Sequence, residues 1–140
     1  RPVPGKTAGR IDWSGERSLL ETYRDQLGIR ATSLSAPIAT LSGGNQQKVV
    51  LARWIARQPR VLIVDEPTRG IDVGAKEDVH DLIRKIAAEG VAILLISSDM
   101  PEVLALADRV QTLFEGRVTG EFAIADASSE MLMERMTRHD

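Results

Sequence analysis

The sequence contains no cysteine, which excludes disulfides, thiolate zinc sites and a cysteine nucleophile. It also lacks a long apolar run, because the longest, Val91–Ile96, is far shorter than the ~18 residues of a membrane span. Its first ten residues have no apolar core and do not resemble a signal peptide. Basic tracts are missing and the net charge is −2, which argues against a nucleic-acid partner. If the protein works at a membrane, we therefore expect it to act through a partner.

What is present is the composition of an ordinary soluble protein, with 43% hydrophobic and 27% charged residues. A length of 140 residues suits one domain with a core. We expect the first ten residues to be a loop or a cut end, and Ser14 to cap a helix that ends at Gly28. A second helix is expected to follow the glycines of LSGGNQQK and to run to about Arg57.

The rest of the chain alternates strand and helix patterns. The stretch RVLIVDEP predicts a buried parallel strand, an amphipathic helix closed by Gly90 follows, and Val91–Ile96 predicts a second buried strand. Strand, helix and strand at this spacing form a βαβ unit. The elements expected beyond it are a helix over Met100–Ala107 capped by Asp99, a hairpin over Arg109–Phe122 turning at Glu115-Gly116, and a helix from about Ser128. The fold class is therefore α/β, with a mainly parallel sheet and a C-terminal β-hairpin plus helix.

Two acids, Asp65 and Glu66, end the first predicted strand. The carboxyl ends of strands are where open α/β sheets bind ligands. Neighbouring strand residues point to opposite faces, so the two carboxylates can have different tasks. One can hold Mg²⁺ through water, and the other can accept a proton from an attacking water. Taken alone, however, the pair and Pro67 can simply mark the end of a strand.

Two glycines stand at the start of a predicted helix in LSGGNQQK, although each costs roughly 1 kcal/mol in a helix interior. Ser42 can cap this helix, and Gly43 and Gly44 leave backbone N–H groups uncovered by any Cβ. A helix N-terminus with bare amides suits an anion, phosphate above all. The alternative interpretation is a flexible loop before a helix.

Together, LSGGNQQK and RVLIVDEPTRGID resemble the signature sequence and Walker B segment of ATP-binding cassette (ABC) ATPases in order, spacing and residue types. The wording NQQK, PTRGIDVGAK, ISSDMPEV and EGRVTGEF is similar to the C-terminal cassette of tandem ATPases that power bacterial importers of ribose, galactose, xylose and autoinducer-2. This resemblance implies a partial P-loop NTPase-like domain. Residues 1–58 would be a remnant of the helical subdomain with the signature helix, and residues 59–140 part of the catalytic core.

The resemblance also implies roles for single residues, with ATP and Mg²⁺ as cofactors. The signature residues would close over the γ-phosphate of ATP held by an opposite cassette; they are Ser42, Gly43, Gly44 and Gln46. Asp65 would hold Mg²⁺ through water, and Glu66 would be the catalytic glutamate that polarises the hydrolytic water. Asp72 would be the D-loop aspartate that crosses the dimer interface, and it can equally be the N-cap of the helix after it.

Two departures from the family pattern stand out. Ser98 occupies the switch position where most members have a histidine, and a serine cannot supply an imidazole's charge or reach. This puts hydrolysis in doubt at the site that this switch serves. Neither histidine of the chain is expected to replace it, because His80 lies on an amphipathic helix and His139 near the chain end, and both are expected to be solvated.

The second departure is the phosphate loop, for which Gly5-Lys6-Thr7 is the one tempting match. We reject it because Pro2 and Pro4 remove backbone N–H groups that would cradle phosphates. No strand pattern precedes it, and it lies too near LSGG. The chain is therefore expected to be the C-terminal portion of one nucleotide-binding domain of a longer subunit, and to be inactive on its own.

The resemblance implies partners as well: a second cassette on the same full-length chain, transmembrane permease subunits and, indirectly, a periplasmic sugar-binding protein. The location it implies is the cytoplasmic face of the bacterial inner membrane. Two other functions stay open. A soluble ABC ATPase of translation or DNA repair would favour basic tracts, which are missing, and a non-catalytic interaction module would favour loss of Glu66 or Gly44, both of which are present.

Overall fold

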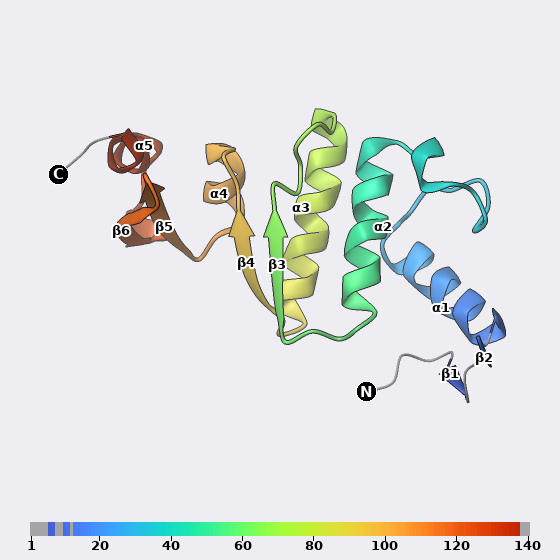
Figure 1. Cartoon of the computed structure of the whole chain (residues 1–140). Helices are drawn as coiled ribbons and strands as arrows, with labels where there is room; N and C mark the ends of the chain where they lie inside the picture. Colours follow the sequence, from blue (N-terminus) through green and yellow to red (C-terminus); the bar gives the residue numbers. More distant parts are fainter. Residues whose placement is uncertain (1–5, 8–9, 12, 138–140) are drawn as a thin grey trace. The chain divides into compact units, whose positions relative to one another are not determined.

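The structure is a computed structural model that describes residues 6–7, 10–11 and 13–137 (Figure 1). The elements in chain order are β1 (Lys6–Thr7), β2 (Arg10–Ile11), α1 (Trp13–Gln26), α2 (Gly43–Ile55), β3 (Val61–Asp65), α3 (Val73–Ala88), β4 (Ala92–Ile96), α4 (Met100–Leu106), β5 (Arg109–Phe114), β6 (Arg117–Ala123) and α5 (Ser129–Thr137), with 3₁₀ turns at Ile38–Thr40 and Ile124–Asp126. The expectation for His139 lies outside the described residues. No described helix has both the length and the apolar character needed to cross a membrane.

The α/β class is confirmed. The described strands form three two-stranded sheets, and the arrows of β3 and β4 run in the same direction, which makes this pair the parallel one (Figure 1). The chain divides into two compact units. The first comprises the described residues up to Leu62 together with Pro67–Leu94, and the second comprises Ile63–Glu66 and the described residues from Leu95 onward.

The first unit has its core between α2 and α3, which contact each other. The 3.6-residue period predicted for α3 is confirmed; its buried residues are Val79, His80, Leu82, Ile83 and Ile86. In α2, Leu51 and Ala52 are buried as well. The expectation that His80 is solvated is wrong, because its side chain is buried, and its Nδ1 lies 3.7 Å from Glu77 Oε2.

A buried cation links the same two helices. The Lys48 side chain is only 9% exposed, and its Nζ donates to Asp78 Oδ2 at 2.8 Å, whereas Asp78 is 57% exposed. The hydrogen bond from Lys48 and then its charge lower the pKa of Asp78, the charge of Arg30 lowers it slightly further, and partial burial opposes them. Because Asp78 binds its proton less readily when folded, its ionised form favours the native state.

This ion pair predicts how stability depends on pH. The contribution of Asp78 is complete above the unfolded carboxyl pKa of about 3.9 and is lost as the pH falls through the lower folded value. We expect the difference in unfolding free energy between wild type and Asp78→Asn to be constant near neutrality and to shrink as the pH falls through about 4 and below. Urea denaturation of both chains across this range measures it. A difference that does not change with pH would contradict the ion pair.

Several expectations for the first unit need correction. The first ten residues are not all loop, because β1 and β2 pair antiparallel with Lys6 opposite Ile11 and Thr7 opposite Arg10. Such a short pairing needs only backbone groups and leaves no side-chain pattern to detect. Ser14 does not cap a helix, because α1 already begins at Trp13. The predicted end at Gly28 is confirmed by its φ of 59°, a left-handed conformation that glycine adopts without strain.

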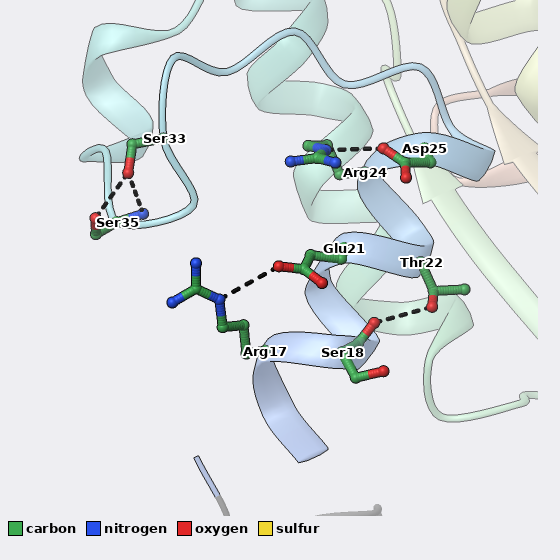
Figure 2. Close-up of polar contacts among 8 residues, drawn as sticks. All are labelled: Arg17, Ser18, Glu21, Thr22, Arg24, Asp25, Ser33 and Ser35. Carbon is green, nitrogen blue, oxygen red and sulfur yellow. Dashed lines mark hydrogen bonds and ion pairs between the residues drawn. The ribbon is translucent and has the colours of Figure 1, made fainter. Parts of the chain in front are cut away.

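Helix α1 buries none of its residues, although the helical spacing of Leu19, Leu20 and Tyr23 gives it an apolar side. Polar contacts line it instead: Arg17 pairs with Glu21 at 3.3 Å, and Arg24 pairs with Asp25 at 2.8 Å (Figure 2). Such exposed pairs contribute little to stability, because water and salt screen them. Packing within the described residues therefore does not account for the apolar side of α1.

Strand β3 is buried on one face only, so the expectation of a fully buried strand is wrong. Leu62 and Val64 are each 5% exposed, whereas Val61 and Ile63 are 60% and 64% exposed. The residues of VLIVD before the acid are all apolar, so the sequence could not reveal this alternation. One face of the strand lacks a cover within the described residues.

In the second unit, the predicted hairpin of β5 and β6 is confirmed. Its turn residues Glu115 and Gly116 have φ values of 47° and 77°, and positive φ at both positions is typical of the type I′ turns that suit hairpin twist. The register places Val110 opposite Phe122 and shifts between Thr112 and Leu113. The predicted C-terminal helix is α5, whose Leu132 is 1% exposed.

Candidate functional site

The first turn of α2 approaches the first turn of α3 and the segment before it very closely. A Cβ placed on Gly44 would lie 2.6 Å from Ala75 Cβ, and one placed on Gly43 would lie 3.0 Å from Ile71 Cγ2. Contacts under 3.0 Å require a shift of the neighbouring atoms, so Gly44 has no room for any side chain. The two glycines therefore have a packing role in addition to leaving their amides open.

Ser42 occupies the N-cap position of α2 but does not cap it through its side chain. Its backbone is extended, with φ −62° and ψ 156°, and the hydroxyl makes no hydrogen bond to the helix amides. Instead, Ser42 Oγ accepts a hydrogen bond from Asn45 Nδ2 at 2.8 Å. The predicted side-chain cap is wrong, because this nearby amide engages the hydroxyl. The amides of the first turn are thus left without the Ser42 side chain as partner.

The side chains of Asn45 and Gln46 form hydrogen bonds to the backbone of segments that precede α2. Asn45 Oδ1 accepts a hydrogen bond from the backbone N–H of Arg30 at 2.8 Å. Gln46 Nε2 donates to the carbonyl of Leu41 at 2.8 Å, so the predicted signature residue Gln46 bonds to the loop before its own helix. The role of Asn45 is not visible in the sequence, because no local pattern pairs it with a residue fifteen positions earlier.

Asp72 is the N-cap of α3, which confirms one of its two predicted roles. Its Oδ1 accepts a hydrogen bond from the backbone N–H of Ala75 at 2.9 Å. Gly70 just before it has a φ of 78°, and its carbonyl oxygen lies 3.7 Å from the Cβ position of Gly43. The structure thus brings the SGG turn and the segment leading to Asp72 together within the first unit.

Glu66 is fixed in the second unit by its backbone and its carboxylate. Its N–H donates to the carbonyl of Ile96 at 2.8 Å, and its Oε1 accepts from the N–H of Ser98 at 3.0 Å. Its φ of 46° is left-handed, a conformation that costs a non-glycine residue of order 1–3 kcal/mol and that clusters at functional sites. The carboxylate is therefore held beyond the carboxyl ends of β3 and β4, as predicted.

Ser98 supports Glu66 through its main chain rather than its side chain. Any residue except proline can supply this N–H, so the lack of a histidine at this position leaves the anchor of Glu66 intact. What the substitution removes is an imidazole. The position of the Glu66 carboxylate therefore does not depend on the side chain at residue 98, whereas any contribution of an imidazole is lost.

Asp65 is exposed at the end of β3. Among the described residues, no three or more His, Cys, Asp or Glu side chains gather in a way that could hold a metal ion. A single exposed carboxylate fits Mg²⁺, because this ion keeps several waters and is often held by one or two carboxylates plus substrate phosphates. It would not fit an ion that needs a cage of protein ligands.

Comparison with known proteins gives the family context. The family model described as ABC transporter matches residues 4–69. The chain is 54% identical over 130 residues to the ribose import ATP-binding protein RbsA 1 of Streptomyces coelicolor, an alignment that covers 93% of the chain and 26% of that protein. It is 48% identical to the ribose import ATP-binding protein RbsA of Geobacillus kaustophilus, covering 94% of the chain and 26% of the relative. The chain thus spans about a quarter of the length of these relatives.

Solved structures confirm the fold. An inward-facing metal-chelate type ABC transporter matches with a TM-score of 0.75 at 20% identity, covering 93% of the chain and 52% of that chain. A dimeric ATP-binding cassette in a post-hydrolysis state with ADP and Pi matches with a TM-score of 0.71 at 23% identity. The match covers 85% of this chain and 51% of the cassette's chain. At such low identity these matches speak for the fold alone.

Proposed function

Because the family model described as ABC transporter matches residues 4–69 and the relatives are import ATP-binding proteins, we propose that this chain belongs to the ATP-binding and ATP-hydrolysing subunit of an importer for a sugar or sugar-like solute. The observation that carries this proposal is the Glu66 carboxylate, held by the N–H of Ser98 beyond two parallel strands. The names of the relatives, which include ribose import and ribose/galactose/methyl galactoside import, supply the class of solute.

In this proposal each unit contributes one half of the chemistry. Ser42, Gly43 and Gly44 would bind the γ-phosphate of ATP carried by another cassette, because amides at a helix start favour an anion. The close packing of Gly44 on Ala75 would keep this turn rigid. Gln46 would act by holding the loop before the turn, and Asp72, besides capping α3, would cross to the opposite cassette.

The acids of the second unit would serve a different ATP. Glu66 would orient the attacking water and accept its proton, and Asp65 would hold Mg²⁺ through water. When bound, Mg²⁺ neutralises charge that develops on the phosphate oxygens. Without an imidazole at Ser98, we propose that hydrolysis at this site is slower than at the site completed by Ser42.

The proposed partners follow from the same assignment. A second cassette would complete each ATP site, transmembrane permease subunits would receive the closure of the two cassettes, and a periplasmic sugar-binding protein would deliver the solute to them. The chain would then lie at the cytoplasmic face of the inner membrane as a peripheral subunit.

ATP binding and hydrolysis by the isolated chain test whether its signature turn and its acids serve different ATP molecules. The isolated 140 residues are expected to bind Mg-ATP only very weakly and to hydrolyse none, because the signature turn contacts only the end of a nucleotide that another segment holds. Calorimetry with Mg-ATP measures the binding, and circular dichroism confirms that the chain is folded. As a positive control, a complete subunit is made by replacing the matching quarter of the Streptomyces coelicolor relative with this chain. Micromolar binding by the isolated chain would contradict the proposal, and so would a complete subunit that hydrolyses no ATP.

A further inference from the structure

Asn45 joins two parts of the first unit through the two ends of its side-chain amide. The oxygen Oδ1 accepts from the backbone N–H of Arg30, and the nitrogen Nδ2 donates to Ser42 Oγ, each at 2.8 Å. A backbone N–H can only donate, so the oxygen of the amide must face Arg30. This fixes the orientation of the amide and turns its NH₂ group toward Ser42.

The direction of the second bond determines what the hydroxyl of Ser42 can do. A hydroxyl carries one proton and two lone pairs, and Ser42 Oγ uses a lone pair to accept from Asn45. Its proton cannot point at Asn45, and a capping bond to the amides of α2, which is absent, would use the second lone pair rather than the proton. The proton is therefore available to an acceptor outside the helix, and a phosphate oxygen is such an acceptor.

We propose that Asn45 is a positioning residue that sets Ser42 as a hydrogen-bond donor to the terminal phosphate of ATP. This inference rests on the function proposed above and adds a device to it. The backbone N–H of Arg30 fixes the amide of Asn45. The amide in turn keeps the Ser42 hydroxyl in place and leaves it as a donor before ATP binds. Donors fixed in advance cost no reorganisation when charge develops, which is why such an arrangement favours catalysis.

Asn45→Asp separates this role from a structural one. The carboxylate keeps the size of the amide and still accepts from the N–H of Arg30, but it cannot donate to Ser42. The hydroxyl would then donate its proton to Asp and present only lone pairs to the phosphate. We expect kcat/KM for ATP in the complete subunit to fall about 10- to 100-fold, the range for a lost hydrogen bond to a charged group. Thermal unfolding should change little.

The substitution also adds a negative charge near the phosphate, so the experiment needs two further variants. Gln47→Glu adds the same charge in the same helical region and should leave kcat/KM within about twofold of wild type. Ser42→Ala removes the hydroxyl, and adding Asn45→Asp to it should cause no further loss if Asn45 acts through Ser42. The readout is therefore non-additivity in a double-mutant cycle.

The outcomes separate this inference from the proposed function. A large effect of Asn45→Asp that disappears in the Ser42→Ala background supports the positioning role. An equal effect in both backgrounds indicates charge repulsion and overturns it, and so does full activity of Asn45→Asp beside an impaired Ser42→Ala. Full activity of Ser42→Ala itself overturns both, because the proposed function assigns the phosphate contact to Ser42.

Discussion

Replacement of Glu66 by Gln is expected to lower ATP turnover at its own site by about 100-fold or more, the range typical of a lost general base. The glutamine side chain has nearly the same shape, and its oxygen can still accept from the N–H of Ser98. What it loses is the ability to take a proton from water. Binding of Mg-ATP should therefore survive while hydrolysis stops.

The structure makes this substitution a clean one. A backbone hydrogen bond to the carbonyl of Ile96 fixes Glu66, whose backbone has a left-handed φ of 46°. Neither feature depends on the charge of the side chain. The unfolding free energy should therefore change little. A variant that loses both stability and activity would instead assign Glu66 a structural role.

Turnover must be measured where only this site contributes. In the complete subunit, the corresponding carboxylate of the other cassette is neutralised first, and phosphate release at saturating Mg-ATP is followed with and without Glu66→Gln. The matched control is Glu115→Gln, which removes the same charge from another residue with positive φ, in the turn of the hairpin. Equal rates for Glu66→Gln and its parent would contradict the catalytic assignment.

The helices and the hairpin were predictable because their signals are local. The apolar period of α3, the glycine that closes it and the Glu115-Gly116 turn each depend on residues a few positions apart. The same holds for the position of Glu66, since the carboxyl end of an apolar strand follows from the strand pattern itself. In such cases local preference and tertiary structure agree.

The remaining features depend on contacts between distant residues. Asn45 meets the N–H of Arg30, and Lys48 is buried because it pairs with Asp78, thirty residues later. A charged residue on a helix is usually solvated, so sequence alone does not predict its burial. The missing cap by Ser42 has a local cause instead, because Asn45, three residues later, engages its hydroxyl. The glycines were interpreted as open amides, and their close approach to α3 became visible only in three dimensions.

That close approach changes what a substitution at Gly44 can prove. Gly44→Asp is expected to abolish ATP-driven uptake, because a carboxylate at the start of α2 repels phosphate. However, any Cβ at this position would lie 2.6 Å from Ala75 Cβ, so loss of packing alone can also impair the protein. Overpacking of this kind typically costs about 1–3 kcal/mol.

Gly44→Ala separates the two effects, since it introduces the same Cβ without the charge. We expect both variants to unfold at lower urea concentration than wild type, because both press on Ala75. Activity per folded molecule, measured as ATP hydrolysis by the complete subunit, should fall much further for Asp than for Ala. A carboxylate in the first turn of a helix interacts favourably with the helix dipole, so helix electrostatics cannot explain a greater loss with Asp.

Gly43 supplies the graded comparison for this test. A Cβ there would lie 3.0 Å from Ile71 Cγ2, the end of a side chain that can move, so Gly43→Ala should destabilise the chain less than Gly44→Ala. If activity per folded molecule follows only the loss of stability across the three variants, the glycines serve packing and the phosphate assignment is wrong. If Gly44→Asp lies far below the trend of the two alanine variants, the remaining loss is repulsion of an anion at the start of α2.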